Sequence, residues 1–328
     1  MPHSVYIQTG SRLHFGPLTN GRHRDRLFGG IGMMIGWPEI QVTLSLAEED
    51  AVHSPAPLEQ KVFEYRDRYR DQVATSDNSP VAIAVEADAS LHSGLGTGTQ
   101  LAMGIAHGLD YLYGHQHPLD QLAKFVGRGR RSALGVHGFQ RGGFLVDGGK
   151  RQESDLGTLV AHQTVSPDWR ILLITPPETQ GLSGEAEEQA FAELDDMPLD
   201  VTSRLCQLVL MEILPALQES DFAALSSAIY EYGAIVGDYF APVQGGRYAN
   251  ERMRNLVDWL RNHGIQGVGQ SSWGPTIFAF CEGAAQASHL KSEILLQPEY
   301  ADCRMEIVQP LNSGARVVPT NEVSALSD

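Results

Sequence analysis

A loop rich in glycine and hydroxyl groups, at residues 90–104, carries the clearest chemistry in this sequence. Gly94, Gly96 and Gly98 let the backbone bend and approach a ligand closely, and Thr97 and Thr99 add hydroxyl donors around Leu95. Apolar residues at helical spacing follow directly, namely Ala102, Ile105, Ala106, Leu109 and Leu112. Because the first amides of a helix lack acceptors and lie at the positive end of its dipole, residues 94–99 are predicted to bind phosphate.

Other functions of such a loop have to be weighed beside this one. A glycine-rich turn before a helix can simply turn the chain. The loop lacks the Gly-Lys-Ser/Thr ending of a P-loop, and no repeated strand and helix units surround it as they would in a dinucleotide-binding fold.

Basic residues gather in one part of an otherwise acidic chain. The formal net charge of −16 over 328 residues argues against nucleic acid as a partner. Between Asp120 and Arg151, however, seven Lys or Arg face two Asp, and Arg22, Arg24 and Arg26 precede Gly29 and Gly30. Arginines beside glycine-rich segments predict a small polyanionic ligand, with Arg128 and Arg131 as phosphate-binding candidates. Any single arginine among them also fits a solvated helix face.

Five segments combine glycine with groups that bind anions: residues 11–16, 26–32, 94–99, 127–149 and 267–275. The last holds Gln270, Ser271, Ser272 and Trp273 in a turn before an expected strand. The tryptophan fits either stacking on an aromatic substrate or plugging the core. Two histidines, His14 and His137, lie in such segments and fit either a structural or a catalytic role.

Periodicity predicts the elements that position these loops. Strands are expected at 5–11, 32–36, 40–46, 81–87, 142–146, 170–175, 276–281 and 303–308. Helices are expected at 58–73, after the glycine loop to residue 112, and at 118–126, 184–194, 201–217, 221–236, 248–263 and 284–296, before a polar tail. This order predicts an α+β protein with a cleft between two lobes, 1–165 and 166–328.

Composition sets further bounds. No apolar run reaches the ~20 residues that span a bilayer, so we expect a cytoplasmic protein without a membrane partner. Cys206, Cys281 and Cys303 lack paired spacing, which predicts neither a disulfide framework nor a thiolate zinc site. No HExxH motif is present, and we expect no tightly held transition metal.

The phosphate loop resembles that of the GHMP kinases, the galactose, homoserine and mevalonate kinase group. Their usual form is Pro-x-x-x-Gly-Leu-Gly-Ser-Ser, and here Ser90 replaces the proline. Gly98 stands where a serine that helps hold magnesium is expected. His137, in Gly135-Val136-His137, stands where several of those kinases carry a catalytic aspartate.

Five further stretches, in order along the chain, resemble a non-kinase branch of that group, the ribofuranosylaminobenzene 5'-phosphate synthases. They are residues 11–16, 29–32, 127–132, 141–144 and 270–275. The resemblance implies the two-domain GHMP fold, with a ribosomal S5 domain 2-like N-terminal lobe and a ferredoxin-like C-terminal lobe, and a homodimer. It also implies a decarboxylating pentosyltransferase of methanopterin biosynthesis. Such an enzyme condenses phosphoribosyl diphosphate with 4-aminobenzoate or 4-hydroxybenzoate, and carbon dioxide and diphosphate leave.

That chemistry gives the candidate residues their expected roles. The diphosphate would be held by residues 94–99 and the arginines at 128–141, and His14, His137 and Arg141 are the candidate catalytic residues. Trp273 would stack on the ring, and Arg12 or Arg26 would pair with its carboxylate. Mg²⁺ is expected with the diphosphate, without an organic cofactor, and Asp147, Glu86 and Asp88 are possible ligands. An ATP-dependent GHMP kinase and a non-catalytic phosphometabolite-binding protein are the alternatives.

Overall fold

Two long antiparallel strands form the spine of the N-terminal lobe in the computed structural model, which describes residues 3–23, 26–73, 78–87, 94–177 and 193–320. Strand β1 (Ser4–Pro17) pairs with β4 (Gly30–Leu46) from Ser4 opposite Ser45 to Pro17 opposite Gly30. Around them lie β13 (Arg316–Thr320), β6 (Val81–Ala87), β5 (Ala51–His53), β7 (Phe144–Asp147) and β8 (Leu159–Gln163). Strands β2 (Arg22–His23) and β3 (Arg26–Leu27) form a separate hairpin.

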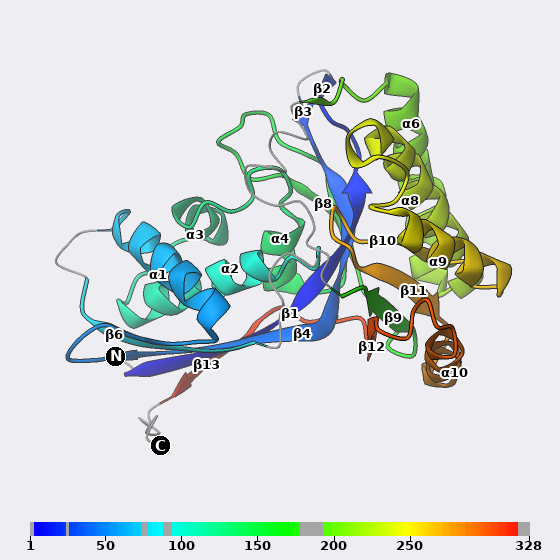
Figure 1. Cartoon of the computed structure of the whole chain (residues 1–328). Helices are drawn as coiled ribbons and strands as arrows, with labels where there is room; N and C mark the ends of the chain where they lie inside the picture. Colours follow the sequence, from blue (N-terminus) through cyan, green and yellow to red (C-terminus); the bar gives the residue numbers. More distant parts are fainter. Residues whose placement is uncertain (1–2, 24–25, 74–77, 88–93, 178–192, 321–328) are drawn as a thin grey trace.

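Helices cover one face of this sheet (Figure 1): α1 (Ala56–Arg70), α2 (Thr97–Leu112), α3 (Leu119–Phe125) and α4 (Leu134–Arg141). The alternation in β4 turns Ile40, Val42 and Leu44 toward them, and apolar residues of all four helices complete this core. Helix α2, which begins directly after the glycine loop, packs on β1 and β4.

The C-terminal lobe is a four-stranded antiparallel sheet in the order β12 (Arg304–Val308), β9 (Arg170–Thr175), β11 (Ile277–Cys281), β10 (Val268–Gln270). That order is the ferredoxin-like one predicted. Its helices are α6 (Leu199–Leu208), α7 (Leu214–Glu219), α8 (Phe222–Gln244), α9 (Glu251–Asn262) and α10 (Ala284–Leu295), and a π-helical turn, η2 (Val209–Ile213), joins α6 to α7. None of the described helices has the length and apolar character needed to cross a membrane.

One hydrophobic cluster belongs to both lobes. It combines Leu13 and Phe15 of β1 with Ile213 of η2, Tyr232 of α8 and Phe278 of β11. The Tyr232 hydroxyl, fully buried, donates to the carbonyls of Gly16 and Pro17 at 3.1 and 3.0 Å. Helix α8 is thereby fixed against the end of β1, as Figure 1 shows.

Several expectations need correction. The stretches 32–36 and 40–46 form one strand, β4, and the glycine-rich passage at 127–142 contains helix α4. The expected polar tail forms strand β13 on the edge of the N-terminal sheet, so the end of the chain returns to the first lobe. Strands β8 and β10 were not expected either. The helix expected at 184–194 lies outside the described residues except for positions 193 and 194. Ser90 and Asp88 also lie outside them.

Candidate active site

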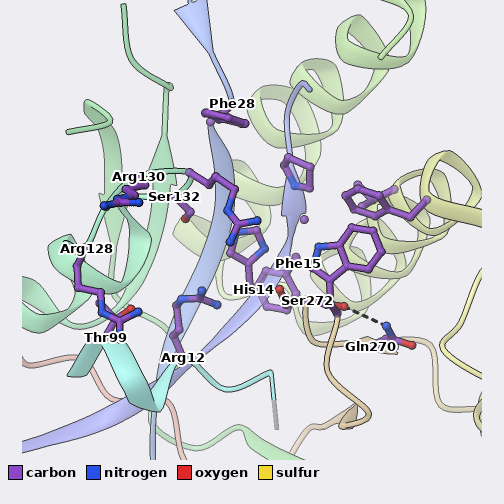
Figure 2. Close-up of a pocket in the computed structure, with 18 of the residues that line it drawn as sticks. Arg12, His14, Phe15, Phe28, Thr99, Arg128, Arg130, Ser132, Gln270 and Ser272 are labelled. Carbon is purple, nitrogen blue, oxygen red and sulfur yellow. Dashed lines mark hydrogen bonds between the residues drawn. The ribbon is translucent and has the colours of Figure 1, made fainter. Parts of the chain in front are cut away.

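A cavity of about 450 Å³ lies where the two lobes meet, and all five glycine-containing segments contribute to it. Nine of the predicted site residues line it: Arg12, His14, Gly29, Thr99, Arg128, Arg131, Gln270, Ser272 and Trp273. Figure 2 shows that Arg12, Arg128, Arg130 and Thr99 lie on one side, and Phe15, Ser272 and Gln270 on the other. The cavity therefore has a cationic wall and an aromatic wall.

Contacts from helix α1 and from Lys150 hold the cationic wall in place. Arg128 donates a hydrogen bond to the Tyr65 hydroxyl, and its guanidinium lies 5.0 Å from the centre of the Tyr65 ring. Its Nε is buried and has no protein partner. The side chain of Lys150 donates to the carbonyls of Arg130 and Glu153, which ties down the turn that carries the arginines. A buried donor without a partner in a cationic wall is suited to an anionic ligand.

The glycine loop is packed too closely for side chains. A Cβ at Gly94 would lie 2.4 Å from the Ser271 carbonyl oxygen, and one at Gly96 would lie 2.7 Å from the Arg12 side chain. Both residues have positive φ, +82° and +70°. At Gly98, the first turn of α2 lies so close to the Arg128 guanidinium that a Cβ would be 3.5 Å from it. An anion beside Thr99 would thus meet the Arg128 guanidinium at the positive end of the α2 dipole.

His14 lies in β1 between the two walls, with only 8% of its surface exposed. Burial, together with the charges of Arg12 and Arg131, holds the pKa of His14 well below its usual range. The imidazole is therefore neutral at neutral pH, and its Nδ1 is buried without a hydrogen-bond partner. A neutral ring of this kind offers one donor and one acceptor to a ligand.

The aromatic wall is built around Trp273. Its ring centre lies 4.3 Å from that of Phe240 on α8, and its side chain is 5% exposed, so the indole is both a core residue and part of the cavity wall. The neighbouring Ser272 has φ +55°, and Phe28, also in the lining, has φ +62°. Non-glycine residues rarely adopt these angles, and residues that do so cluster at functional sites.

Ser271 joins three of the segments instead of facing the cavity. Its hydroxyl donates to the Gly94 carbonyl at 2.9 Å and accepts from the His14 amide at 3.2 Å. The Gln270 side chain accepts from the Ala249 amide and donates to the Ser272 carbonyl, a contact drawn in Figure 2. This network explains why the turn at 270–273 meets the phosphate loop.

Four predicted site residues lie elsewhere. His137 is hydrogen-bonded through Nε2 to the Gly157 carbonyl at 2.7 Å, and Arg141 is exposed at the far end of α4. Arg26 donates to the carbonyls of Gly148 and Gly149, and Gly30 is buried within β4 opposite Pro17. None of them lines the cavity. Of the phosphate loop, Gly94, Leu95, Gly96, Thr97 and Gly98 lie behind the lining and Thr99 within it.

Two of the possible magnesium ligands, Asp147 and Glu86, also lie outside the cavity lining. Asp147 is 1% exposed and accepts from the amides of Ala133 and Gly149 at 2.8 Å, which pins the start of α4; burial raises its pKa despite these bonds. Glu86 is exposed on β6. Among the described residues, Glu64 of α1 is the one carboxylate that lines the cavity, and it pairs with Lys61 at 2.7 Å and Arg68 at 2.8 Å.

Helices α1 and α8 supply site residues that the sequence did not single out. They contribute Lys61, Glu64, Arg68, Gly233, Val236, Gly237, Phe240 and Gln244. On α1 the signal was a polar i, i+3, i+7 pattern at Lys61, Glu64 and Arg68, which looks like an ordinary solvated face. On α8, Gly233 leaves open space beside the aromatic wall, and Gly237 allows Arg247 to pack closely, since a Cβ there would lie 2.6 Å from the Arg247 carbonyl oxygen.

Two family models match the chain, one in each lobe. Residues 60–143, from α1 to the end of α4, match the model described as GHMP kinases N terminal domain. Residues 213–297, from the end of η2 to just beyond α10, match the model described as GHMP kinases C terminal.

Curated relatives match most of the chain. A beta-ribofuranosylphenol 5'-phosphate synthase of Methanothermobacter thermautotrophicus is 29% identical over 84% of this chain and 88% of the relative. Enzymes of the same name from Archaeoglobus fulgidus (27%, covering 95% and 98%) and Methanocaldococcus jannaschii (29%, covering 84% and 89%) are also similar.

Solved structures share the fold at low sequence identity. A mevalonate diphosphate decarboxylase from Enterococcus faecalis superposes with a TM-score of 0.67 at 11% identity, covering 98% of this chain and 100% of the other. A homoserine kinase from Cytophaga hutchinsonii gives 0.62 at 14% identity, covering 97% and 98%. Both support the two-lobed architecture described above.

Proposed function

Because the chain belongs to the GHMP kinase family and is similar over most of its length to beta-ribofuranosylphenol 5'-phosphate synthases, we propose that it condenses phosphoribosyl diphosphate with a 4-substituted benzoate. Carbon dioxide and diphosphate are the other products, and the product belongs to methanopterin biosynthesis. The observation that carries the proposal is the two-sided cavity, in which a cationic wall faces an aromatic one across a neutral His14.

The cationic wall serves the departure of diphosphate. The bond between the anomeric carbon and the diphosphate oxygen breaks, and the electron pair leaves with the oxygen. Negative charge therefore grows on the leaving group, where Arg128, Arg131 and the positive end of the α2 dipole stabilise it. Preorganised donors act most strongly in a partly enclosed site from which water is excluded.

The aromatic wall serves the benzoate. Trp273, Phe240 and Phe15 hold the ring so that the carbon bearing its carboxylate faces the anomeric carbon. A bond forms between these two carbons. The bond from the ring to the carboxylate then breaks, its electron pair restores the aromatic ring, and carbon dioxide leaves. Charge and atoms balance without an added proton.

His14 orients the substituent opposite the carboxylate. Positive charge in the ring intermediate spreads to that substituent, which makes its hydrogen more acidic. The neutral imidazole accepts a hydrogen bond from it, and the buried, unpartnered Nδ1 is suited to this role. The names of the relatives contain a phenol, so we propose 4-hydroxybenzoate before 4-aminobenzoate.

Glu64 is the residue that would hold Mg²⁺. One carboxylate together with substrate phosphate oxygens and water is a common ligand set for this ion. Although burial opposes ionisation, the Lys61 hydrogen bond and nearby guanidinium groups hold the pKa of Glu64 below its usual value, so the carboxylate is ionised at neutral pH. Bound Mg²⁺ would neutralise part of the diphosphate charge.

Two parallel reaction mixtures test the proposal. The protein is incubated with phosphoribosyl diphosphate, Mg²⁺ and 4-hydroxybenzoate labelled with ¹³C in the carboxyl group, and 4-aminobenzoate is supplied in a parallel mixture. Mass spectrometry should find an unlabelled riboside phosphate, with the label released as carbon dioxide and one diphosphate per product. If neither benzoate gives such a product, the proposal fails.

A separate assay tests the kinase alternative. Labelled ATP with a panel of small alcohols should give no phosphoryl transfer. His137, which stands where several GHMP kinases carry a catalytic aspartate, is bound to the Gly157 carbonyl and lies outside the cavity lining. Binding of phosphoribosyl diphosphate without turnover would instead favour the non-catalytic alternative. The homodimer stays a prediction.

A further inference from the structure

A second cluster of chemically capable side chains lies away from the cavity. Asp110, His115 and His117 place one ligand atom each within 4.8 Å of one another. Oδ1 of Asp110 accepts from Nδ1 of His117 at 2.6 Å, and the Tyr69 hydroxyl lies 3.0 Å from both Asp110 Oδ1 and His115 Nδ1. We propose that Asp110, His115 and His117 bind a divalent transition metal ion such as Zn²⁺.

Three helices hold these groups together. Asp110 lies in the last turn of α2, and its backbone and side-chain oxygens accept from the amides of His115 and His117, at 2.9 and 3.2 Å. This folds the turn after α2 back over the helix end. Phe125 of α3 packs edge-on against the His117 ring at 5.2 Å and the Tyr69 ring at 5.8 Å. The donors are therefore gathered before any ion binds, which lowers the cost of ordering them.

The donor set suits Zn²⁺, Cu²⁺ or Ni²⁺ better than Mg²⁺. Two imidazole nitrogens and one carboxylate oxygen, with a water as the fourth ligand, form a common zinc site. Ligand atoms around tetrahedral zinc lie about 3.4 Å apart. The contact of 2.6 Å between Asp110 and His117 would have to open toward that spacing, and the other ligand atoms, within 4.8 Å of one another, would have to draw in. Tyr69 then supports the ligands through its hydroxyl as an outer hydrogen-bond partner.

The pair stands in the sequence as His115-Gln116-His117, and the expectation of no tightly held transition metal overlooked it. Asp110 lies about 20 Å along α2 from Thr97, because the helix rises 1.5 Å per residue. The ion would therefore not take part in the reaction. It would join the end of α2 to the connection between α2 and α3, and so stabilise the N-terminal lobe.

Metal binding by the whole chain tests this. Cys206 is exposed, so all proteins carry Cys206→Ser to remove a competing thiolate. After treatment with a chelator and its removal, calorimetric titration with Zn²⁺ should show one ion per chain with a Kd below about 1 μM. Thermal unfolding should shift upward with Zn²⁺, and Cu²⁺-loaded protein should give an electron paramagnetic resonance spectrum with two nitrogen ligands.

Variants assign the site. The pair His115→Gln and His117→Gln should weaken Zn²⁺ binding at least a hundredfold and remove the two-nitrogen spectrum, while turnover without Zn²⁺ stays unchanged. Tyr69→Phe should weaken binding about tenfold with both nitrogens retained. His289→Gln is the matched control, because that imidazole is 75% exposed on α10 and should leave binding unaltered.

Two results would overturn the proposal: parent protein that binds Zn²⁺ no more tightly than about 10 μM, or a double variant that keeps the tight site. If the double variant does not fold, each single substitution replaces it. Both imidazoles are only partly buried, and each substitution should remove one nitrogen from the spectrum.

Discussion

At the scale of single residues, His14 connects the two walls of the cavity. Its amide donates to Ser271, its carbonyl accepts from the Ser272 amide at 2.9 Å, and its ring faces the arginines. The same arginines that stabilise diphosphate lower the pKa of this imidazole. One set of charges therefore does two things, since it binds the leaving group and keeps the histidine neutral as an acceptor.

Replacing His14 separates hydrogen bonding from packing. His14→Leu removes the acceptor, and we expect kcat/KM to fall about a hundredfold or more. His14→Asn keeps a polar acceptor and should lose about tenfold. In the unmodified enzyme, protonation of His14 as pH falls removes the acceptor, so the acidic loss of kcat/KM should lie well below pH 6.5. Equal activity of His14→Leu and the unmodified enzyme would contradict the role given to the imidazole.

Arg128 and Arg141 allow a controlled comparison, because Arg128 lies in the cavity wall and Arg141 lies outside it. Arg128→Ala should raise the KM for phosphoribosyl diphosphate at least tenfold, because an anion at the start of α2 loses a charged donor. Arg141→Ala should change KM less than twofold. Steady-state kinetics with varied phosphoribosyl diphosphate measures both. An equal effect of the two substitutions would mean that the anion lies elsewhere.

At the scale of elements, the sequence predicted the long periodic segments well. The helix after the glycine loop and strands β6, β9, β11 and β12 lie close to where periodicity places them. Helix α4 was missed because Gly135 and Gly138 lower helix propensity. In the fold these glycines let α4 approach Thr99 and Met34. Strand β13 was missed because Pro319 argues against a strand, yet proline is tolerated on an edge.

The glycine loop can be tested as an element with a control that isolates steric overlap. Gly94→Ala places a methyl group 2.4 Å from the Ser271 carbonyl at φ +82°. Gly264→Ala carries the same backbone strain at φ +84°, with no atom within 4 Å. We expect Gly264→Ala to cost about 1–2 kcal/mol of unfolding free energy. Gly94→Ala should cost more and reduce turnover at least tenfold, measured by denaturant unfolding and product formation. Equal losses of stability would show that the loop is not closely packed against the turn at 270–273.

At the scale of the whole molecule, the site exists because distant segments converge. The sequence identified five segments but could not place them, since nothing local in residues 11–16 indicates that they meet residues 270–273. For the same reason, the sequence could not indicate that Arg26, His137 and Arg141 lie outside the cavity. Each lies in a segment of the right composition, and only the pairing of β4 with β7 and the direction of α4 decide where its side chain goes.

Tyr232 tests whether the lobes act as one unit. Burial raises the pKa of this phenol well above its usual value, so it stays a donor to the carbonyls of Gly16 and Pro17. Tyr232→Phe keeps the ring and leaves two buried carbonyls without that donor, which should cost about 1–3 kcal/mol and lower Tm by about 2–4 °C.

Because the shared cluster joins both lobes, calorimetry of both the unmodified protein and Tyr232→Phe should show one transition. Gly16 and Pro17 also line the cavity, so the variant should raise KM for phosphoribosyl diphosphate more than it lowers kcat. Tyr300→Phe is the control, because Tyr300 is buried within the outer core of the C-terminal lobe and should leave KM unaltered. Two separate transitions, or an equal KM effect of the control, would mean that the cavity does not depend on how α8 fixes the end of β1.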